Sequence, residues 1–142
     1  MSKLRNVLVS SGELSGDVVA APFVAYLVSR GVRCFGLGGA QLVRAGLEPT
    51  WTRDGVSVTG LSEAVGGLLP TIRLYRQLSA SVADADALLL SDFPEVNLRL
   101  MKLAKKHGVP VVYLAPPQAW AWRPWRSKSL MDAHYVGCLF PF

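Results

Sequence analysis

The chain has 142 residues, enough for one domain with a substantial core and too few for two. Hydrophobic residues make up 51% of the sequence and charged residues 18%, which fits a heavily buried α/β sheet or a domain that keeps an apolar surface for a partner or membrane. The net charge of +5 favours anionic partners, namely phosphates, acidic lipid headgroups or nucleic acid, without choosing among them.

The apolar runs exclude a membrane-spanning helix. The longest, such as Ala87–Leu90 and Gly137–Phe140, have the length of a strand and are far too short to cross a bilayer. The first residues contain no apolar leader followed by a cleavage site. We therefore expect a cytoplasmic protein, in which Cys34 and Cys138 are buried reduced thiols rather than a disulfide.

Short apolar runs alternate with segments of helical period, the pattern of βαβ units. In the first part of the chain we expect a strand at Val7–Ser10, a helix from about Asp17 to Ser29, a strand at Val32–Leu37, a short helix that ends at Ala45, and a strand and loop within Glu48–Gly60.

The second part continues the alternation. Pro70 interrupts or restarts its first helix. We expect a helix over Leu61–Ala83, a strand at Ala87–Ser91, a helix at Pro94–His107 closed by Gly108, a strand at Val109–Leu114, a helix at Arg126–Asp132, and a strand at His134–Phe140.

These strands lack polar alternation and are joined by crossovers, which predicts a parallel sheet covered on both faces. The expected fold class is α/β, a Rossmann-like three-layer domain over residues 1–142. In such sheets ligands bind beyond the carboxyl ends of the strands, so the loop at residues 11–17 is the first place to look for a site.

That loop excludes two nucleotide-binding classes. Gly12 and Gly16 are spaced G-x-x-x-G, which misses the dinucleotide fingerprint G-x-G-x-x-G, and no acidic residue closes the second strand. The chain also lacks the G-K-[ST] of P-loop enzymes. A nicotinamide, flavin or P-loop enzyme is therefore disfavoured.

The loop still carries usable chemistry. Gly12 and Gly16 let the backbone turn tightly and approach a ligand, and Glu13 and Ser15 can hydrogen-bond sugar hydroxyls. The structural alternative is that Ser15 caps the following helix and Asp17 complements its dipole.

Five segments in order resemble one family. Gly-Glu-Leu-Ser-Gly-Asp at residues 12–17 resembles the G-E-x-S-G-D loop of lipid-A-disaccharide synthases. The family's later motifs are matched by Gly-Leu-Gly-Gly-Ala at 36–40, Thr-Gly-Leu-Ser-Glu at 59–63, Asp-Phe-Pro-Glu-Val-Asn at 92–97, and Pro-Gln-Ala-Trp-Ala-Trp-Arg at 117–123.

The resemblance implies the amino-terminal, acceptor-side half of a two-domain GT-B glycosyltransferase. Such enzymes join UDP-2,3-diacylglucosamine to 2,3-diacylglucosamine 1-phosphate with inversion, forming a β-1,6-linked disaccharide and UDP without metal or organic cofactor. The carboxyl-terminal domain, which holds the nucleotide sugar, is expected to be absent from this chain, so the chain alone is expected to be inactive.

Asp92 follows the strand Ala87–Ser91 and, by the resemblance, occupies the position of the base that takes the proton from the attacking hydroxyl. The structural alternative is a capping box, in which Asp92 caps the next helix and Glu95 answers it. Asn97, about one turn into that helix, either orients the base or a sugar hydroxyl or is an ordinary surface residue. Glu63 becomes a candidate site residue through the resemblance alone.

The segment from Trp120 to Lys128 interleaves three indoles with three cations. It can stack nucleobases, lie at a lipid–water interface, or supply core tryptophans with a charged rim. The resemblance favours a role in shaping the cleft and contacting anionic substrate, with Trp122, Arg123 and Arg126 as the residues to test.

An apolar stripe lies on one side of the predicted helix at residues 61–83, with arginines nearby. A buried helix face is the usual explanation. Because both implied substrates carry acyl chains, the stripe is also a candidate for contact with an anionic membrane on the inner face of the inner membrane. The candidate membrane-facing residues are Leu61, Val65, Leu68, Leu69 and Ile72.

Two alternatives to the enzyme remain open. A lone acceptor domain can be a non-catalytic module that binds lipid or phosphosugar, and charge with the Trp/Arg segment is the argument for a nucleic-acid-binding domain, which we do not expect. His107 and His134 have no partners at ligand spacing, so we expect no metal site.

Overall fold

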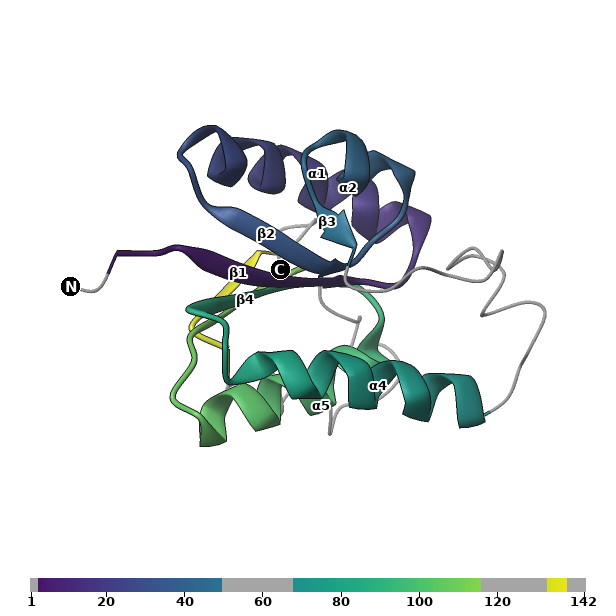
Figure 1. The fold of residues 1–142 in the computed structure, drawn as a ribbon. Helices are drawn as coiled ribbons and strands as arrows, with labels where there is room; N and C mark the ends of the chain where they lie inside the picture. Colours follow the sequence, from purple (N-terminus) through teal and green to yellow (C-terminus); the bar gives the residue numbers. More distant parts are fainter. Residues whose placement is uncertain (1–2, 50–67, 116–132, 138–142) are drawn as a thin grey trace.

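The computed structural model of the chain describes residues 3–49, 68–115 and 133–137. Six parallel strands form one sheet in the order β3-β2-β1-β4-β5-β6. Helices α1 and α2 cover one face of the sheet and helices α4 and α5 the other (Figure 1). The predicted Rossmann-like three-layer fold is confirmed.

The bounds of the elements follow. The strands are β1 (Asn6–Ser11), β2 (Arg33–Leu37), β3 (Glu48–Pro49), β4 (Ala87–Ser91), β5 (Val111–Leu114) and β6 (Tyr135–Gly137). The helices are α1 (Leu14–Ser29), α2 (Ala40–Arg44), α4 (Leu68–Val82) and α5 (Pro94–Lys106).

Most of these bounds lie within one or two residues of the predicted ones. The clear difference is α1, which begins at Leu14 instead of Asp17, because the backbone becomes helical immediately after the extended residue Glu13. In α4, Pro70 occupies the first turn, where a missing N–H disrupts no helical hydrogen bond. Residues 61–67 of the helix predicted at Leu61–Ala83, the predicted helix at Arg126–Asp132 and the strand residues beyond Gly137 lie outside the described residues.

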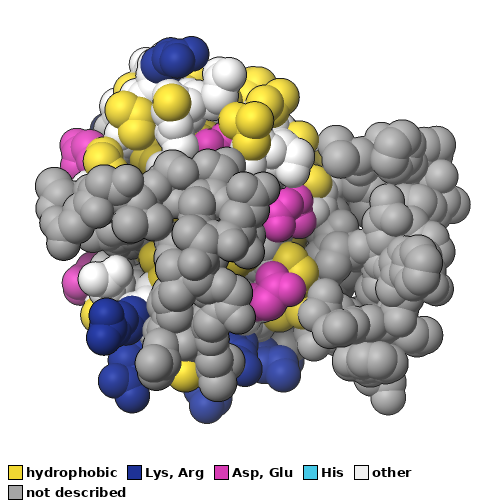
Figure 2. Space-filling view, turned by 90° about the vertical axis from the view of Figure 1, so that its right-hand side faces the viewer, with side chains coloured by type: hydrophobic (Ala, Val, Ile, Leu, Met, Phe, Trp, Pro, Cys, Tyr) yellow, Lys and Arg dark blue, Asp and Glu magenta, His cyan; other side chains and the backbone are white. Residues whose placement is uncertain are grey.

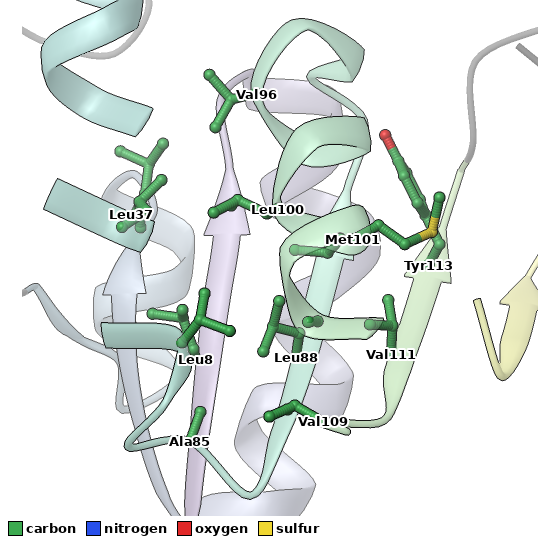
Figure 3. Packing of buried hydrophobic residues seen from close by; sticks show 14 of the residues in the cluster. Leu8, Leu37, Ala85, Leu88, Val96, Leu100, Met101, Val109, Val111 and Tyr113 are labelled. Carbon is green, nitrogen blue, oxygen red and sulfur yellow. The ribbon is translucent and has the colours of Figure 1, made fainter. Parts of the chain in front are cut away.

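Both faces of the sheet are apolar, which explains why the strands lack polar alternation. Val7 and Val9 of β1 pack under α1 against Ala20 and Val24. Alternate residues point to the other face, where Leu8 and Leu88 meet Leu100 and Met101 of α5 (Figure 3). The sheet is therefore a rigid platform whose strand ends can position side chains.

Two smaller predictions fall on described residues. Cys34 is a buried free thiol, as predicted, and burial raises its pKa to about 11. His107 ends α5 immediately before Gly108, which has a positive φ of 67°. Within the part of the chain that the structure describes, no helix is long and apolar enough to cross a membrane.

Candidate active site

The loops after β1 and β4 meet at the centre of the sheet. These two strands are neighbours, yet the chain leaves β1 for α1 on one face and leaves β4 for α5 on the other (Figure 1). Such a switch point opens a crevice at the carboxyl ends of the strands, where ligands of α/β sheets bind. Glu13, Ser15 and Asp92 all lie in or beside these two loops.

Asp92 has an unusual backbone that its neighbours hold in place. Its φ is +51° and that of Phe93 is +49°, in the left-handed region that costs a residue with a side chain roughly 1–2 kcal/mol. The carbonyl oxygen of Asp92 accepts hydrogen bonds from Nδ2 of Asn97 and from the hydroxyl of Tyr113, both at 2.7 Å. These two bonds help to fix the turn and so the direction in which the Asp92 side chain leaves it.

The Asp92 carboxylate faces the first loop rather than its own helix. Ser15 Oγ donates a hydrogen bond to Asp92 Oδ2 at 3.2 Å. Helix α5 begins with Phe93 as its N-cap, and no side chain makes a capping hydrogen bond there. The capping interpretation of Asp92 is therefore wrong, because the left-handed turn carries its carboxylate away from the helix end. The same holds for Ser15, which lies inside α1 and does not cap it.

Glu13 lies in the same site, beside Asp92. The pKa of the Glu13 carboxyl is raised, and partial burial is the largest cause. It is raised further by the charge of Asp92, by a hydrogen bond with the Asp92 side chain and by the charge of Glu95. A raised pKa means that the Glu13 carboxyl binds a proton more tightly than an isolated glutamate does. Glu13 can therefore hold a proton beside Asp92 at the carboxyl ends of the strands.

The two loop glycines bring the loops together. A Cβ atom at Gly12 would collide with the ring of Phe93, and one at Gly16 would lie 2.7 Å from Ser11 Oγ. Ser91 Oγ donates a hydrogen bond to the carbonyl of Gly16 at 2.9 Å, which joins α1 to the end of β4. The close approach predicted for these glycines is thus made to protein atoms, and their contact with a ligand stays a prediction.

Asn97 lies beneath the site and is fully buried, so the alternative of an ordinary surface residue is wrong. Besides the carbonyl of Asp92, its Nδ2 lies within hydrogen-bond distance of the carbonyls of Ser10, at 3.1 Å, and Ser91, at 3.2 Å. One amide therefore holds the ends of β1 and β4 and the turn of Asp92 together. This geometry makes Asn97 a positioning residue; contact with a sugar hydroxyl stays a prediction.

Tyr113 is a structural part of the site that sequence reasoning missed, and Asp17 has a structural role beyond the one expected. Asp17 is buried; its carboxylate accepts hydrogen bonds from Ser11 Oγ and from the backbone N–H of Gly39, both at 2.8 Å. It ties the loops after β1 and β2 together, beyond complementing a helix dipole. The sequence does carry one signal for Tyr113, which is a tyrosine within an apolar strand. The hydroxyl of a buried tyrosine needs a hydrogen-bond partner, and this need points to a structural role.

The structure shows none of the remaining candidate site residues beside Glu13, Ser15 and Asp92. Ile72 is half-buried on α4, and the structure does not describe the side chains of Leu68 and Leu69. No three His, Cys, Asp or Glu side chains of the described residues are grouped to hold a metal ion. Outside the described residues lie Leu61, Glu63, Val65, Trp122, Arg123 and Arg126.

The effect of Asp92 on the pKa of Glu13 can be measured by titration of the 142-residue chain. A raised pKa means that the folded chain binds this proton more tightly, so the group's contribution to stability is complete below the unfolded pKa and is lost as the pH rises through the folded one. We expect Asp92→Asn to lower the pKa of Glu13, because one negative charge is removed, while partial burial keeps it above its usual value. Carboxyl carbon NMR shifts followed against pH would show this.

Asp84→Asn is the matched control for that titration, because Asp84 is an exposed aspartate in the turn that follows α4. It should leave the Glu13 midpoint unchanged. Equal Glu13 midpoints in the parent and in Asp92→Asn would show that the two carboxyls do not interact.

The comparisons with known proteins agree with the motifs. The model of the family described as lipid-A-disaccharide synthetase matches residues 7–142. The lipid-A-disaccharide synthase of Syntrophotalea carbinolica is 40% identical over 97% of this chain and 37% of its own length, and that of Myxococcus xanthus is 38% identical over 100% of this chain and 38% of its own length. The protein of the same name from Acidobacterium capsulatum is 34% identical over 100% of this chain.

The match covers nearly the whole chain but a minor part of each relative. The chain spans 37% of the length of the Syntrophotalea carbinolica protein. The family match includes both loops of the switch point and the strands that carry them. The chain belongs to the lipid-A-disaccharide synthetase family.

Proposed function

We propose that this chain is the acceptor-side part of an inverting glycosyltransferase that makes the lipid A disaccharide. The reaction joins UDP-2,3-diacylglucosamine to 2,3-diacylglucosamine 1-phosphate and releases UDP. The observation that carries the proposal is the Asp92 carboxylate at the switch point, which accepts a hydrogen bond from Ser15 and helps to raise the pKa of Glu13. Its support from outside the structure is membership of the family.

In this proposal Asp92 is the general base. It takes the proton from the acceptor's 6-hydroxyl as that oxygen attacks C1 of the donor sugar, and the bond from C1 to the UDP oxygen breaks on the opposite side. Ser15 orients the carboxylate through its hydrogen bond, and Glu13, whose pKa is raised, lies beside it. The turn fixed by Asn97 and Tyr113 keeps the base in one direction, so little reorganisation is needed when the hydroxyl arrives.

The donor side belongs to the part of the enzyme that this chain does not span. The chain covers 37–38% of the relatives from Syntrophotalea carbinolica and Myxococcus xanthus, which fits one lobe of a GT-B enzyme whose other lobe holds the nucleotide. Glu63, Trp122, Arg123 and Arg126 are proposed to line the acceptor side of the cleft between the lobes. The arginines would contact the substrate phosphates.

The proposed location is the cytoplasmic side of the inner membrane, with peripheral attachment. Both substrates carry acyl chains, and the net charge of +5 favours an anionic surface. Leu61, Val65, Leu68, Leu69 and Ile72 are the membrane-facing residues proposed from the sequence.

The test is transfer activity with and without a second domain. We expect no disaccharide from the 142-residue chain alone, and disaccharide and UDP from a fusion of this chain with the carboxyl-terminal part of the Myxococcus xanthus protein. A fusion that folds and binds both substrates but makes no disaccharide would contradict the proposal. Binding of the acylated acceptor without any turnover would favour a lipid-binding module, and tight binding of oligonucleotides instead would favour the nucleic-acid alternative.

A further inference from the structure

Phe93 lies between the two loops of the switch point, in a backbone conformation that a bulky residue rarely adopts. Its φ is 49° and its ψ 59°, in the left-handed region. It also precedes Pro94, and the residue before a proline is normally extended. Such conformations persist where the surrounding structure determines them, and they gather at functional sites. The Phe93 side chain therefore needs contacts that hold it in this position.

Two sets of contacts hold the Phe93 side chain. The residue is half-buried and packs against the apolar cluster between the sheet and helices α4 and α5. Its ring also meets Gly12, in the loop after β1. Figure 2 views the edge of the sheet where the two loops lie, and both acidic and hydrophobic side chains are visible on it. Phe93 thus connects the core under α5 with the loop that leads into α1.

The contact with Phe93 explains why residue 12 is a glycine. A Cβ atom there would collide with Cγ, Cδ1 and Cδ2 of the ring. Because Cγ lies on the axis about which the ring turns, a turn of the ring would not clear the collision. Gly12 is not among the glycines with a positive φ, so its φ is one that an alanine can also adopt. The ring of Phe93 is therefore the obstacle to a side chain at residue 12.

The contact joins the residues that flank the two carboxyls of the site. Gly12 precedes Glu13, and Phe93 follows Asp92. The spacing of the two loops sets how close Glu13 and Ser15 come to Asp92, whose Oδ2 accepts the hydrogen bond from Ser15 at 3.2 Å. Loss of the contact would let the loops separate and would move both groups away from the Asp92 carboxylate.

We propose that Phe93 is a positioning residue: its ring, held against Gly12, sets the spacing of the two loops and keeps Glu13 and Ser15 beside the Asp92 carboxylate. The inference rests on the proposed function for its effect on transfer, because a base acts efficiently only when it is held in a fixed geometry. Its effect on the geometry of the site needs no turnover and can be measured on the 142-residue chain.

The contact itself is tested by NMR of the parent chain. Nuclear Overhauser effects should connect the ring protons of Phe93 with the α protons of Gly12, since one of these protons points toward the ring in place of a Cβ atom. Their absence would overturn the inference, whether or not any variant folds.

Phe93→Ala should lower the pKa of Glu13. Without the ring the Glu13 carboxyl is less buried and lies farther from Asp92, so both causes that raise its pKa are weakened. The midpoint is read from carboxyl carbon shifts during a pH titration. Tyr75→Ala is the matched control, because Tyr75 is a half-buried aromatic residue on α4 that packs against the same apolar cluster. It should leave the Glu13 midpoint unchanged, even if it lowers stability.

A pair of glycine variants tests the contact from the other loop. Gly12→Ala should also lower the pKa of Glu13, because the added methyl group pushes the loops apart. It should have no further effect once Phe93→Ala has removed the ring. Gly38→Ala is the control, since a Cβ atom at Gly38 would collide with Leu42 of α2 instead of Phe93. Its effect on stability should be the same with and without the ring.

Transfer by the fused enzyme tests the consequence for the reaction. Phe93→Ala should lower kcat about tenfold or more with little change in KM, because substrate still binds while the base is misplaced. Phe93→Leu should recover most of the rate, since leucine keeps a Cγ and two Cδ carbons, the atoms that meet Gly12. Tyr75→Ala should keep the parent kcat at temperatures where it remains folded, which separates positioning from stabilisation of the fold.

Three further results would overturn the inference. They are a folded Phe93→Ala chain with the parent midpoint of Glu13, an effect of Gly12→Ala that is undiminished without the ring, and a parent kcat in the fused Phe93→Ala enzyme. Failure of the proposed function is recognised separately. An active Asp92→Asn enzyme would remove Asp92 as the base, while the effect of Phe93 on the Glu13 midpoint would still be measured in the 142-residue chain.

Discussion

Asp92→Asn should remove most of the transfer activity of a full-length protein that carries this segment. An amide cannot take the proton from the attacking hydroxyl, and loss of a general base lowers the rate by about 100-fold or more. The change should leave the fold intact, because Asn97 and Tyr113 hold the main-chain carbonyl of residue 92 and the substitution does not alter it. The initial rate of disaccharide formation, measured with both substrates saturating, tests this.

Asp84→Asn is the control, since Asp84 is an exposed aspartate outside the loops of the switch point. It should retain the parent rate, and both variants should unfold at the parent temperature. If Asp92→Asn keeps activity within about threefold of the parent, Asp92 is not the base. The proposed mechanism would then fail, while membership of the family would stand on its own evidence.

The sheet and its order of elements could be predicted because they depend on patterns that are local in sequence. Unbroken apolar runs such as Leu88–Leu90 indicate strands buried on both faces, and the alternation with helical periods indicates crossovers. A ligand edge at the carboxyl ends of the strands follows from this topology alone. The loop after β4 could therefore be chosen as a candidate ligand-binding loop before its geometry was known.

The direction of the Asp92 side chain could not be predicted in the same way. Asp-x-x-Glu before an apolar helix is also the local pattern of a capping box. The direction of the Asp92 side chain depends instead on Asn97 and on Tyr113, which lies on a strand 21 residues further along the chain. The family resemblance favoured a site residue over a cap; the structure shows that Asp92 does not cap α5, and its role as the base stays a prediction.

The burial of polar residues could not be predicted from the sequence either. Asn97 and Asp17 are types that usually lie at surfaces, and a single sequence does not reveal the distant backbone groups that pair with them. Asn97 reaches Ser10, 87 residues away, and Asp17 reaches Gly39, 22 residues away. Their burial follows from the meeting of separate loops at one edge of the sheet.

Asn97→Ala should destabilise the folded chain by about 2–3 kcal/mol. The change removes the one donor shared among the carbonyls of Ser10, Ser91 and Asp92, and it leaves a small cavity at a fully buried position. Part of this loss is offset, because Asn97 Oδ1 is buried without a partner among the described residues and disappears with the side chain. Urea unfolding followed by circular dichroism gives the free energy of unfolding.

Asn6→Ala is the matched control, since Asn6 is a half-buried asparagine at the start of β1, at the opposite end of that strand from the site. We expect it to lower the free energy of unfolding by less than about 1 kcal/mol. In the fused enzyme Asn97→Ala should also slow transfer at temperatures where the protein remains folded, because the turn that aims the Asp92 carboxylate loses one of its two hydrogen bonds. A stability loss equal to that of Asn6→Ala, or a folded variant with the parent rate, would show that Asn97 neither joins the strand ends nor positions the base.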